Sequence, residues 1–293
     1  MPVVLGIGNG GCRTLDYMIE SGEYEGITFI AVDSDKESLN RSKARHKILL
    51  SWNPAWGKGI NGNSKAVRRA AQRAVRDIAG YLEGADMAFI IAGMGGRTGT
   101  GLAPVLAETA RKMGILTVGI AFLPFQFEGL TRLKAAHLGA EKFSRSVDSM
   151  LVVDNEKLWK LVDEVPRQAV QSVSELLGKH GFVKTSFEDI RTMLRGASST
   201  VMGLGVESGE NRMENAIRSA IGFPFNIPVE GASRVVLCMT TGPNVRLVEL
   251  ERAEKSIREK MNPDARLAFG HVIDKNIGEE VKAVLFAAFP AGK

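Results

Sequence analysis

The stretch Gly95-Gly96-Arg97-Thr98-Gly99-Thr100-Gly101 follows the apolar run Met87–Ala92 and opens a helix that is expected from about Leu102. Glycine lets backbone N–H groups come close to a ligand, and the N-terminus of the helix adds partial positive charge. The two threonine hydroxyls can donate to a phosphate or ligate Mg²⁺. The stretch is therefore predicted to cradle an anion at the carboxyl end of a strand.

Two further glycine-rich segments occupy comparable places in the chain. Gly6-Ile7-Gly8-Asn9-Gly10-Gly11 follows Val3–Leu5, and Gly57–Asn63 precedes a helix that is expected from about Ser64. One such segment can be an ordinary strand-to-helix turn. Because ligands of open α/β sheets bind at the carboxyl edge of the strands, three of them favour one shared ligand.

The first segment alone also fits the dinucleotide pattern G-x-G-x-x-G, with Asp33 at a strand end where a nicotinamide enzyme binds ribose. A dinucleotide domain needs one such loop for its pyrophosphate, whereas a chain of three phosphates can occupy two. The sequence contains no G-x-x-x-x-G-K-[ST], so a P-loop enzyme is disfavoured. A nucleoside triphosphate is the favoured ligand, and a nicotinamide enzyme is the weakest alternative.

The first half of the chain alternates short apolar runs with segments of helical period, which predicts a mainly parallel sheet covered on both faces. The expected strands are Val3–Gly6, Ile27–Val32, Lys47–Leu50, Met87–Ala92, Leu116–Ala121 and Met150–Val153. The expected helices are Thr14–Glu20, Lys65–Leu82, Ala103–Met113 and Leu130–Arg145.

From Asn155 onward the pattern changes to that of a smaller α+β unit. Helices are expected over Glu156–Val162 and Gln168–His180, with Pro166 ending or kinking the first. Further helices are expected near Phe187–Leu194, Glu210–Ile221 and Val245–Met261, and strands near Thr200–Glu207, Arg234–Thr240, Arg266–Ile273 and Glu280–Phe289.

Composition indicates an ordinary globular chain in a reducing compartment. The 293 residues are 44% hydrophobic and 24% charged, with only two cysteines, Cys12 and Cys238. No basic segment precedes the first apolar run, and the longest apolar run, Ile115–Leu123, is far shorter than the roughly 18 residues of a spanning helix. A cytoplasmic protein without a transmembrane segment is expected.

Basic residues are concentrated between Ser38 and Arg76, a stretch without Asp or Glu in a chain of net charge +5. They are Arg41, Lys43, Arg45, Lys47, Lys58, Lys65, Arg68, Arg69, Arg73 and Arg76. The pattern fits either a solvated helix face or a surface that attracts an acidic partner, an anionic membrane or nucleic acid.

Several motifs together resemble the tubulin/FtsZ superfamily. Gly95–Gly101 is similar to the signature G-G-G-T-G-T-G, with Arg97 in place of the third glycine. Ala31–Asp35, Pro124–Gly129, Met202–Gly205 and Ser208–Arg212 resemble FtsZ segments in the same order along nearly the whole chain.

The resemblance implies a nucleotide-binding domain over 1–163, a central helix over 164–181 and a C-terminal activation-type domain over 182–293. It implies GTP or GDP, with Mg²⁺ as a further candidate, held between subunits that stack head to tail into a filament of the cell-division cytoskeleton. The nucleotide-binding residues that it implies are Gly8, Asn9, Gly10, Gly11, Gly95, Gly96, Arg97, Thr98, Gly99, Thr100, Gly101, Pro124, Glu128, Arg132 and Asn155.

The sequence departs from the family at the loop that completes the next subunit's nucleotide site. Lys184 and Ser186 stand where the family has an Asn and the first catalytic Asp, and only the second Asp survives, as Asp189. A serine can neither accept a proton from water as a carboxylate does nor hold a metal ion as well. GTPase activity is therefore expected to be weak or lost.

Other departures concern the ligand itself. The family segment with a base-stacking aromatic and a base-reading carboxyl or amide is missing after Val162, which leaves the choice between GTP and ATP open. Arg97 can pair with a phosphate, obstruct the cradle or point outward, and Cys12-Arg13 replaces a Gly-Asn pair. The chain stops at Lys293, so attachment to division partners through a C-terminal tail peptide is not expected.

The leading hypothesis is a divergent FtsZ-like protein that binds nucleotide and assembles with itself. The alternative is a non-hydrolysing scaffold or regulator that binds an acidic partner, membrane or nucleic acid through Arg41–Arg76.

Overall fold

The computed structural model describes residues 1–22, 24, 26–50, 75–158, 160–178, 181–197, 199–223 and 227–289. The third glycine-rich segment, Gly57–Asn63, and the basic residues from Lys58 to Arg73 lie outside these ranges. The chain divides into two compact units, Met1–Arg167 and Gln168–Lys293.

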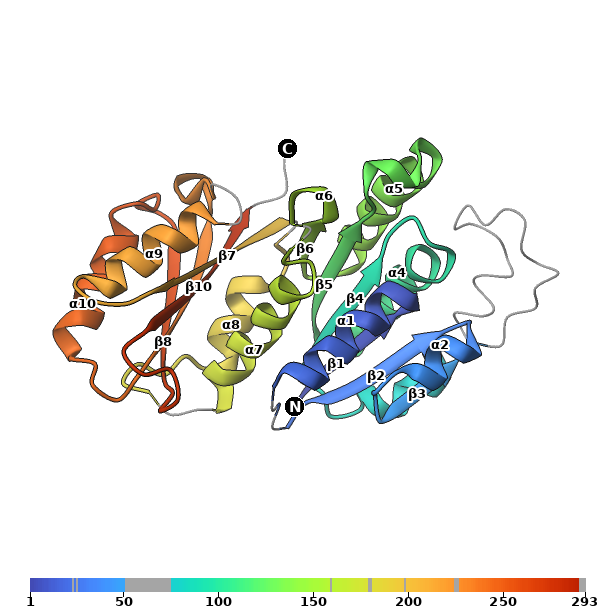
Figure 1. Cartoon of the computed structure of the whole chain (residues 1–293), viewed down its shortest axis with the longest axis horizontal. Coiled ribbons are helices and arrows are strands. Elements are labelled where there is room, and N and C mark those ends of the chain that lie inside the picture. The colour runs from blue at the N-terminus through green and yellow to red at the C-terminus, as the bar shows by residue number, and fades with distance from the viewer. Residues whose placement is uncertain are drawn as a thin grey trace. The chain divides into compact units, whose positions relative to one another are not determined.

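The N-terminal unit is built on a parallel sheet whose strands run in the order β3-β2-β1-β4-β5-β6 (Figure 1). The strands are β1 (Pro2–Ile7), β2 (Thr28–Asp33), β3 (His46–Leu49), β4 (Met87–Gly93), β5 (Leu116–Leu123) and β6 (Ser149–Asp154). The helices are α1 (Gly8–Ser21), α2 (Lys36–Arg41), α4 (Arg97–Lys112), α5 (Leu130–Ser146) and α6 (Asn155–Leu158), with a 3₁₀ turn, η2 (Gln126–Glu128).

This arrangement confirms the predicted α/β architecture and indicates which edge of the sheet can bind a ligand. Strands β1 and β4 consist almost entirely of buried residues, as expected for parallel strands covered on both faces. From β1 the chain moves to β2 on one side and later to β4 on the other. Such a reversal of strand order creates the crevice in which open α/β sheets bind ligands.

The two leading glycine-rich stretches are helix starts rather than loops, which corrects the predicted boundaries. Helix α1 begins at Gly8 instead of Thr14, and α4 begins at Arg97 instead of Leu102. A Cβ built on Gly99 would lie 2.3 Å from the carbonyl oxygen of Gly93, so glycine is required for the close approach of α4 to β4. Low helix propensity hid these first turns in the sequence.

The strands of the C-terminal unit lie in the order β7-β10-β8-β9, with β10 antiparallel to both neighbours and β8 parallel to β9. Its strands are β7 (Ser199–Glu207), β8 (Arg234–Thr241), β9 (Arg266–Ile273) and β10 (Val281–Phe289). Its helices are α8 (Phe187–Leu194), α9 (Arg212–Gly222) and α10 (Leu247–Arg258), with a 3₁₀ turn, η3 (Val229–Gly231). Helix α9 packs on β7 and β10, and α10 packs on α9, which confirms the smaller α+β unit.

Helix α7 (Glu164–Gly178) runs across the division between the two units. Pro166 lies in its first turn, so the prediction that this proline ends or kinks the preceding helix was wrong. Proline is tolerated in the first turn because the amide that it lacks would have no intrahelical acceptor there.

Candidate functional site

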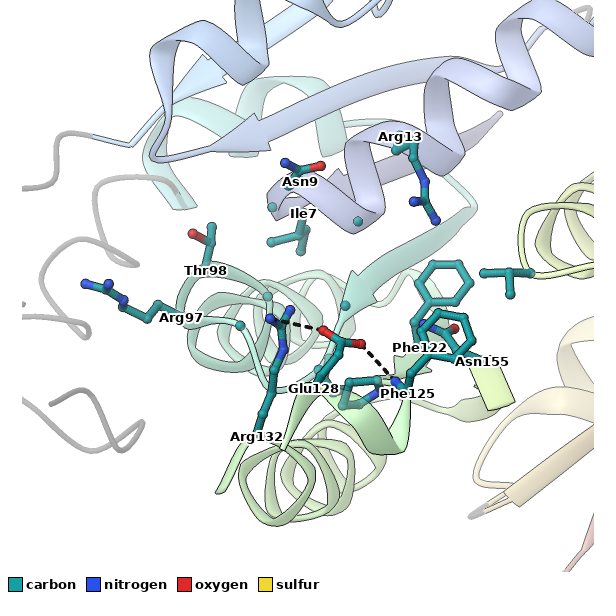
Figure 2. Close-up of a pocket in the computed structure, with 18 of the residues that line it drawn as sticks. Ile7, Asn9, Arg13, Arg97, Thr98, Phe122, Phe125, Glu128, Arg132 and Asn155 are labelled. Carbon is teal, nitrogen blue, oxygen red and sulfur yellow. Dashed lines mark hydrogen bonds and ion pairs between the residues drawn. The ribbon is translucent and has the colours of Figure 1, made fainter. Parts of the chain in front are cut away.

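A cavity of about 700 Å³ opens at the carboxyl ends of β1, β4 and β5. Eleven predicted nucleotide-binding residues line it: Gly8, Asn9, Gly10, Gly96, Arg97, Thr98, Gly99, Pro124, Glu128, Arg132 and Asn155 (Figure 2). A volume of this size is typical of small-molecule sites, which span about 300–1,000 Å³. The structure thus brings the segments around Gly8 and Gly99 together at one edge of the sheet.

The remaining predicted residues of the unit, Gly11, Gly95, Thr100 and Gly101, are not among those that line the cavity. Thr100 instead accepts a hydrogen bond on its hydroxyl oxygen from the Gly95 amide at 2.9 Å, which fixes the turn that leads into α4. A Cβ on Gly11 would lie 2.3 Å from the Ile91 carbonyl oxygen, so this glycine allows α1 to pack against β4.

Two helix N-termini meet at the cavity with their amides available. Neither α1 nor α4 has a side-chain cap or an acidic residue in its first turn, within the part of the chain that the structure describes. Uncapped N–H groups at a helix start bind anions, and the helix dipole favours negative charge there.

Glycine also keeps the floor of the cavity open. A Cβ on Gly96 would find no protein atom nearer than the Gly93 oxygen at 3.9 Å, and one on Gly10 would meet the Gly93 Cα at 3.6 Å. A side chain at either position would therefore extend into the cavity, where a ligand is expected to lie.

Glu128 organises the opposite wall. One carboxylate oxygen accepts the Phe125 amide at 2.8 Å, and the other lies 3.1 Å from the Arg132 guanidinium. Figure 2 shows that the Arg132 guanidinium projects into the cavity beside Glu128. The side chain of Arg97 points away from this pair, although the residue contributes to the lining.

Asn155 supplies a buried acceptor at the far end of the cavity. Its Oδ1 atom is buried and has no hydrogen-bond partner among the described residues. A buried polar atom without a partner is costly, and a hydroxyl or amine of a ligand would satisfy this one.

Asp33, which the dinucleotide alternative requires as a ribose ligand, is one of the residues that line the cavity. Its Oδ1 accepts the Ser34 amide at 2.6 Å and the Asp35 amide at 3.3 Å, and the Thr98 hydroxyl lies 3.5 Å away. The side chain is 4% exposed and holds the turn after β2.

The candidate catalytic residue Asp189 belongs to the C-terminal unit, at the start of α8. Its Oδ2 accepts the Ser186 amide at 3.0 Å and the Ser186 hydroxyl at 2.6 Å, and these bonds hold the pKa of Asp189 below its ordinary value. Lys184 and Asp189 line a separate cavity of about 490 Å³ with Arg258 and Arg266. The one retained carboxylate is therefore engaged in a helix cap, in basic surroundings.

Some lining residues were not among the predicted site residues, chiefly Arg13, Phe122, Phe125 and Val162. Arg13 was noted only as a departure from the family. Within the described ranges, no group of three or more His, Cys, Asp and Glu side chains could hold a metal ion. In the same ranges, no helix is both long and apolar enough to cross a bilayer.

Comparison with known families identifies the chain. Residues 2–163 match the model of the Tubulin/FtsZ family, GTPase domain, and residues 198–288 match that of the FtsZ family, C-terminal domain. The chain belongs to the tubulin/FtsZ family. This membership confirms the resemblance and decides against a nicotinamide enzyme.

Solved structures of the tubulin/FtsZ family superimpose on nearly the whole chain. An FtsZ W319Y mutant from M. jannaschii is 31% identical, with a TM-score of 0.87 over 98% of this chain and 90% of that one. An empty FtsZ dimer from the same organism has the same identity and TM-score, over 98% of this chain and 87% of that one. A GDP-bound CetZ1 monomer from Haloferax volcanii is 24% identical, with a TM-score of 0.80 over 98% and 93% of the two chains, and supports the fold.

Proposed function

We propose that this chain binds GTP or GDP in the 700 Å³ cavity and assembles with itself head to tail into filaments, with GTP hydrolysis weak or lost. The meeting of two uncapped helix N-termini at one cavity carries the proposal. The GDP in the related CetZ1 structure supports the same class of ligand.

The residues of the cavity fit a nucleotide from end to end. The first turns of α1 and α4 would hold the phosphates through backbone amides, with Thr98 and Arg132 as side-chain donors. The unpaired Oδ1 of Asn155 would accept from the nucleoside. Mg²⁺ in nucleotide sites is bound largely through the phosphates and water, so it would require few protein carboxylates.

Weak hydrolysis is inferred from the loop before α8. A residue that positions water or accepts its proton typically contributes a factor of about 10² to 10⁴ in rate. Ser186 offers a hydroxyl where a carboxylate would be needed, and Asp189 is hydrogen-bonded to Ser186. Lys184 adds a positive charge at the same place.

Self-association is inferred from the FtsZ dimer, which is 31% identical over 98% of this chain. A head-to-tail contact joins two different surfaces and leaves one of each free, so repetition produces a filament. We propose that these filaments serve as cytoskeletal filaments, the role that the family resemblance implies.

The test is to extract the nucleotide that co-purifies with the protein, separate it by chromatography, and sediment the protein with GTP and with GDP. We expect guanine nucleotide in the extract and pelleted protein with GTP. Gly96→Val, which places a side chain in the cavity, is expected to abolish both results. Folded protein that neither carries nor binds a guanine nucleotide would contradict the proposal.

The scaffold alternative remains a prediction of the sequence. Lys58, Lys65, Arg68, Arg69 and Arg73 lie outside the described residues. Arg41, Lys43, Arg45, Lys47 and Arg76 are exposed, which either a solvated face or a binding surface would require.

A further inference from the structure

A cation row begins at the end of α2 and runs into β3, the outermost strand of the sheet in the N-terminal unit (Figure 1). Its members, all exposed, are Arg41, Lys43, Arg45 and Lys47. Between them Ser42 and Ala44 are buried and His46 is half-buried, so the backbone is anchored while the charges reach solvent. An extended chain rises about 3.3 Å per residue, so the backbones of consecutive members are spaced up to about 7 Å apart.

An aspartate of α1 holds this segment in place. Asp16 Oδ1 accepts the Ser42 hydroxyl and the Lys43 amide, both at 2.7 Å, and the Ser42 hydroxyl oxygen accepts the Ala44 amide at 3.3 Å. The cations are therefore carried by a backbone that is already positioned, which lowers the entropic cost of binding a ligand.

The charges of the row are available to a ligand. Lys43 pairs with Glu20, both side chains being 52% exposed, and Lys47 Nζ donates to the Asn40 carbonyl oxygen at 3.3 Å. An exposed ion pair contributes little to stability, so a phosphate can replace it. Among the described residues, the two arginines of the row have no ion pair or side-chain hydrogen bond.

An aromatic pair lies on the other side of β3. The rings of His46 and Tyr81 are 4.7 Å apart between centroids and inclined at 50°, and Tyr81 is 39% exposed. Because neighbouring side chains of a strand point to opposite faces, His46 points away from the side of Lys47. The outermost strand thus has cations on one side and a partly exposed aromatic ring on the other.

We propose that the cation row and Tyr81 form a binding site for single-stranded nucleic acid, with phosphates along the row and a base stacked on Tyr81. Proteins that bind single strands without sequence preference combine a positive surface for the backbone with aromatic side chains for the bases. A membrane surface or an acidic peptide would pair with the cations, but neither supplies a planar group for the aromatic ring on the opposite side. Of the described residues that line the proposed nucleotide cavity, none belongs to this surface, so the inference does not rest on that cavity.

The experiment is a fluorescence anisotropy titration of full-length protein into a labelled oligothymidylate of about 16 nucleotides, the longest site of a single binding domain. Binding of this kind has a Kd of about 1–100 μM at physiological salt, and each phosphate contact on a single strand contributes about −0.7 to the slope of log Kobs against log salt. Replacement of all four members of the row by glutamine should therefore make the slope less negative by about 2.8. Between about 50 and 200 mM salt, wild type should lose about 50-fold more affinity than this variant.

A matched variant separates the surface from net charge. It also replaces four exposed cations by glutamine, at the end of α4 and on α5: Lys112, Lys134, Lys142 and Arg145. Because these side chains lie outside the row, the variant should keep the slope of wild type.

Tyr81→Leu tests the stacked base. It keeps an apolar side chain beside His46 but removes the aromatic ring. Stacking on one base predicts that affinity for the oligothymidylate falls about 5- to 150-fold, with the salt slope unchanged. Affinity for a duplex of the same length should stay the same, since its bases are already stacked. Thermal unfolding establishes that each variant is folded.

Several results would overturn the proposal. One is folded wild-type protein that does not bind the oligothymidylate at about 50 mM salt. Another is an equal change of slope in the two glutamine variants, because binding would then follow net charge alone. Displacement of the oligothymidylate by GDP would place it in the nucleotide cavity instead. Unchanged affinity of Tyr81→Leu, with phosphatidylserine vesicles or polyglutamate competing for the row, would assign the surface to a membrane or an acidic protein.

Discussion

Gly96 and Gly99, both at the start of α4, are expected to respond differently to an added methyl group. Gly99→Ala would place a Cβ 2.3 Å from the Gly93 oxygen, whereas real Cβ atoms essentially never come closer than 3.0 Å. The contact is with backbone at the end of β4, which cannot rotate away. Helix α4 would have to move off the strand to relieve the clash.

The size of the effect follows from two opposing terms. Overpacking costs typically about 1–3 kcal/mol, and contact with a rigid carbonyl belongs near the upper end. Alanine within a helix regains about 1 kcal/mol relative to glycine. The net loss for Gly99→Ala is about 2 kcal/mol, which lowers the Tm of a unit of this size by about 4–8 °C.

Gly96→Ala is the matched control for stability. Its Cβ would lie no nearer than 3.9 Å from protein atoms, at a backbone φ of −85° that alanine adopts freely. Its stability should stay within about 0.5 kcal/mol of wild type, while its nucleotide affinity falls because the methyl group enters the cavity. Thermal unfolding of nucleotide-free protein and GDP titration measure the two effects. Equal stability of Gly99→Ala and wild type would refute the packing argument. Unchanged GDP affinity of Gly96→Ala would refute the proposal that the start of α4 binds the phosphates.

Three other predictions concern the C-terminal unit. Burial lowers the pKa of His271 from 6.5 to about 4, so the unfolded state binds more protons in this interval. The free energy of unfolding should therefore fall by up to about 3 kcal/mol as the pH drops from 6.5 to about 4. Urea unfolding at several pH values measures this loss, and His271→Gln should lose less stability over the same interval than wild type does. The double variant Lys184→Asn, Ser186→Asp should raise GTP hydrolysis at least about 10²-fold in a phosphate-release assay, and an unchanged rate would contradict the assignment of this loop. Lys282→Met should cost about 3–5 kcal/mol in urea unfolding, because it removes the ammonium group 3.5 Å from the buried Glu175 carboxylate and leaves that charge uncompensated. Lys282→Met with Glu175→Leu should be near neutral.

The sheet and most element positions were predictable because burial leaves a direct mark on the sequence. Helix α8 spans Phe187–Leu194 as predicted, since a capping serine precedes it and apolar residues recur at helical spacing. The starts of α1 and α4 were missed because glycine contributes neither apolar period nor helix propensity.

The contact between α1 and the residue before α7 could not be predicted, for a different reason. Thr14 and Asp163 are 149 positions apart, and neither stands in a motif that marks it as a partner of the other. The missing segment after Val162 predicted the loss of a base-reading carboxyl or amide. The fold brings Asp163 beside Arg13, and only the tertiary structure shows that contact.

The two proposed activities depend on different kinds of groups, and this difference explains how one can persist without the other. The proposed phosphate site would consist of backbone amides at two helix starts, so substitution of a side chain elsewhere would not remove it. Hydrolysis is proposed to depend on side chains of a short loop in the other unit, where Lys184 and Ser186 stand in place of the Asn and Asp that the resemblance implies. Ser186 also caps α8 with Asp189, so the altered loop keeps its own fold stable. A chain can therefore lose turnover at that loop while the nucleotide site in the N-terminal unit, and the energy of binding there, stay intact.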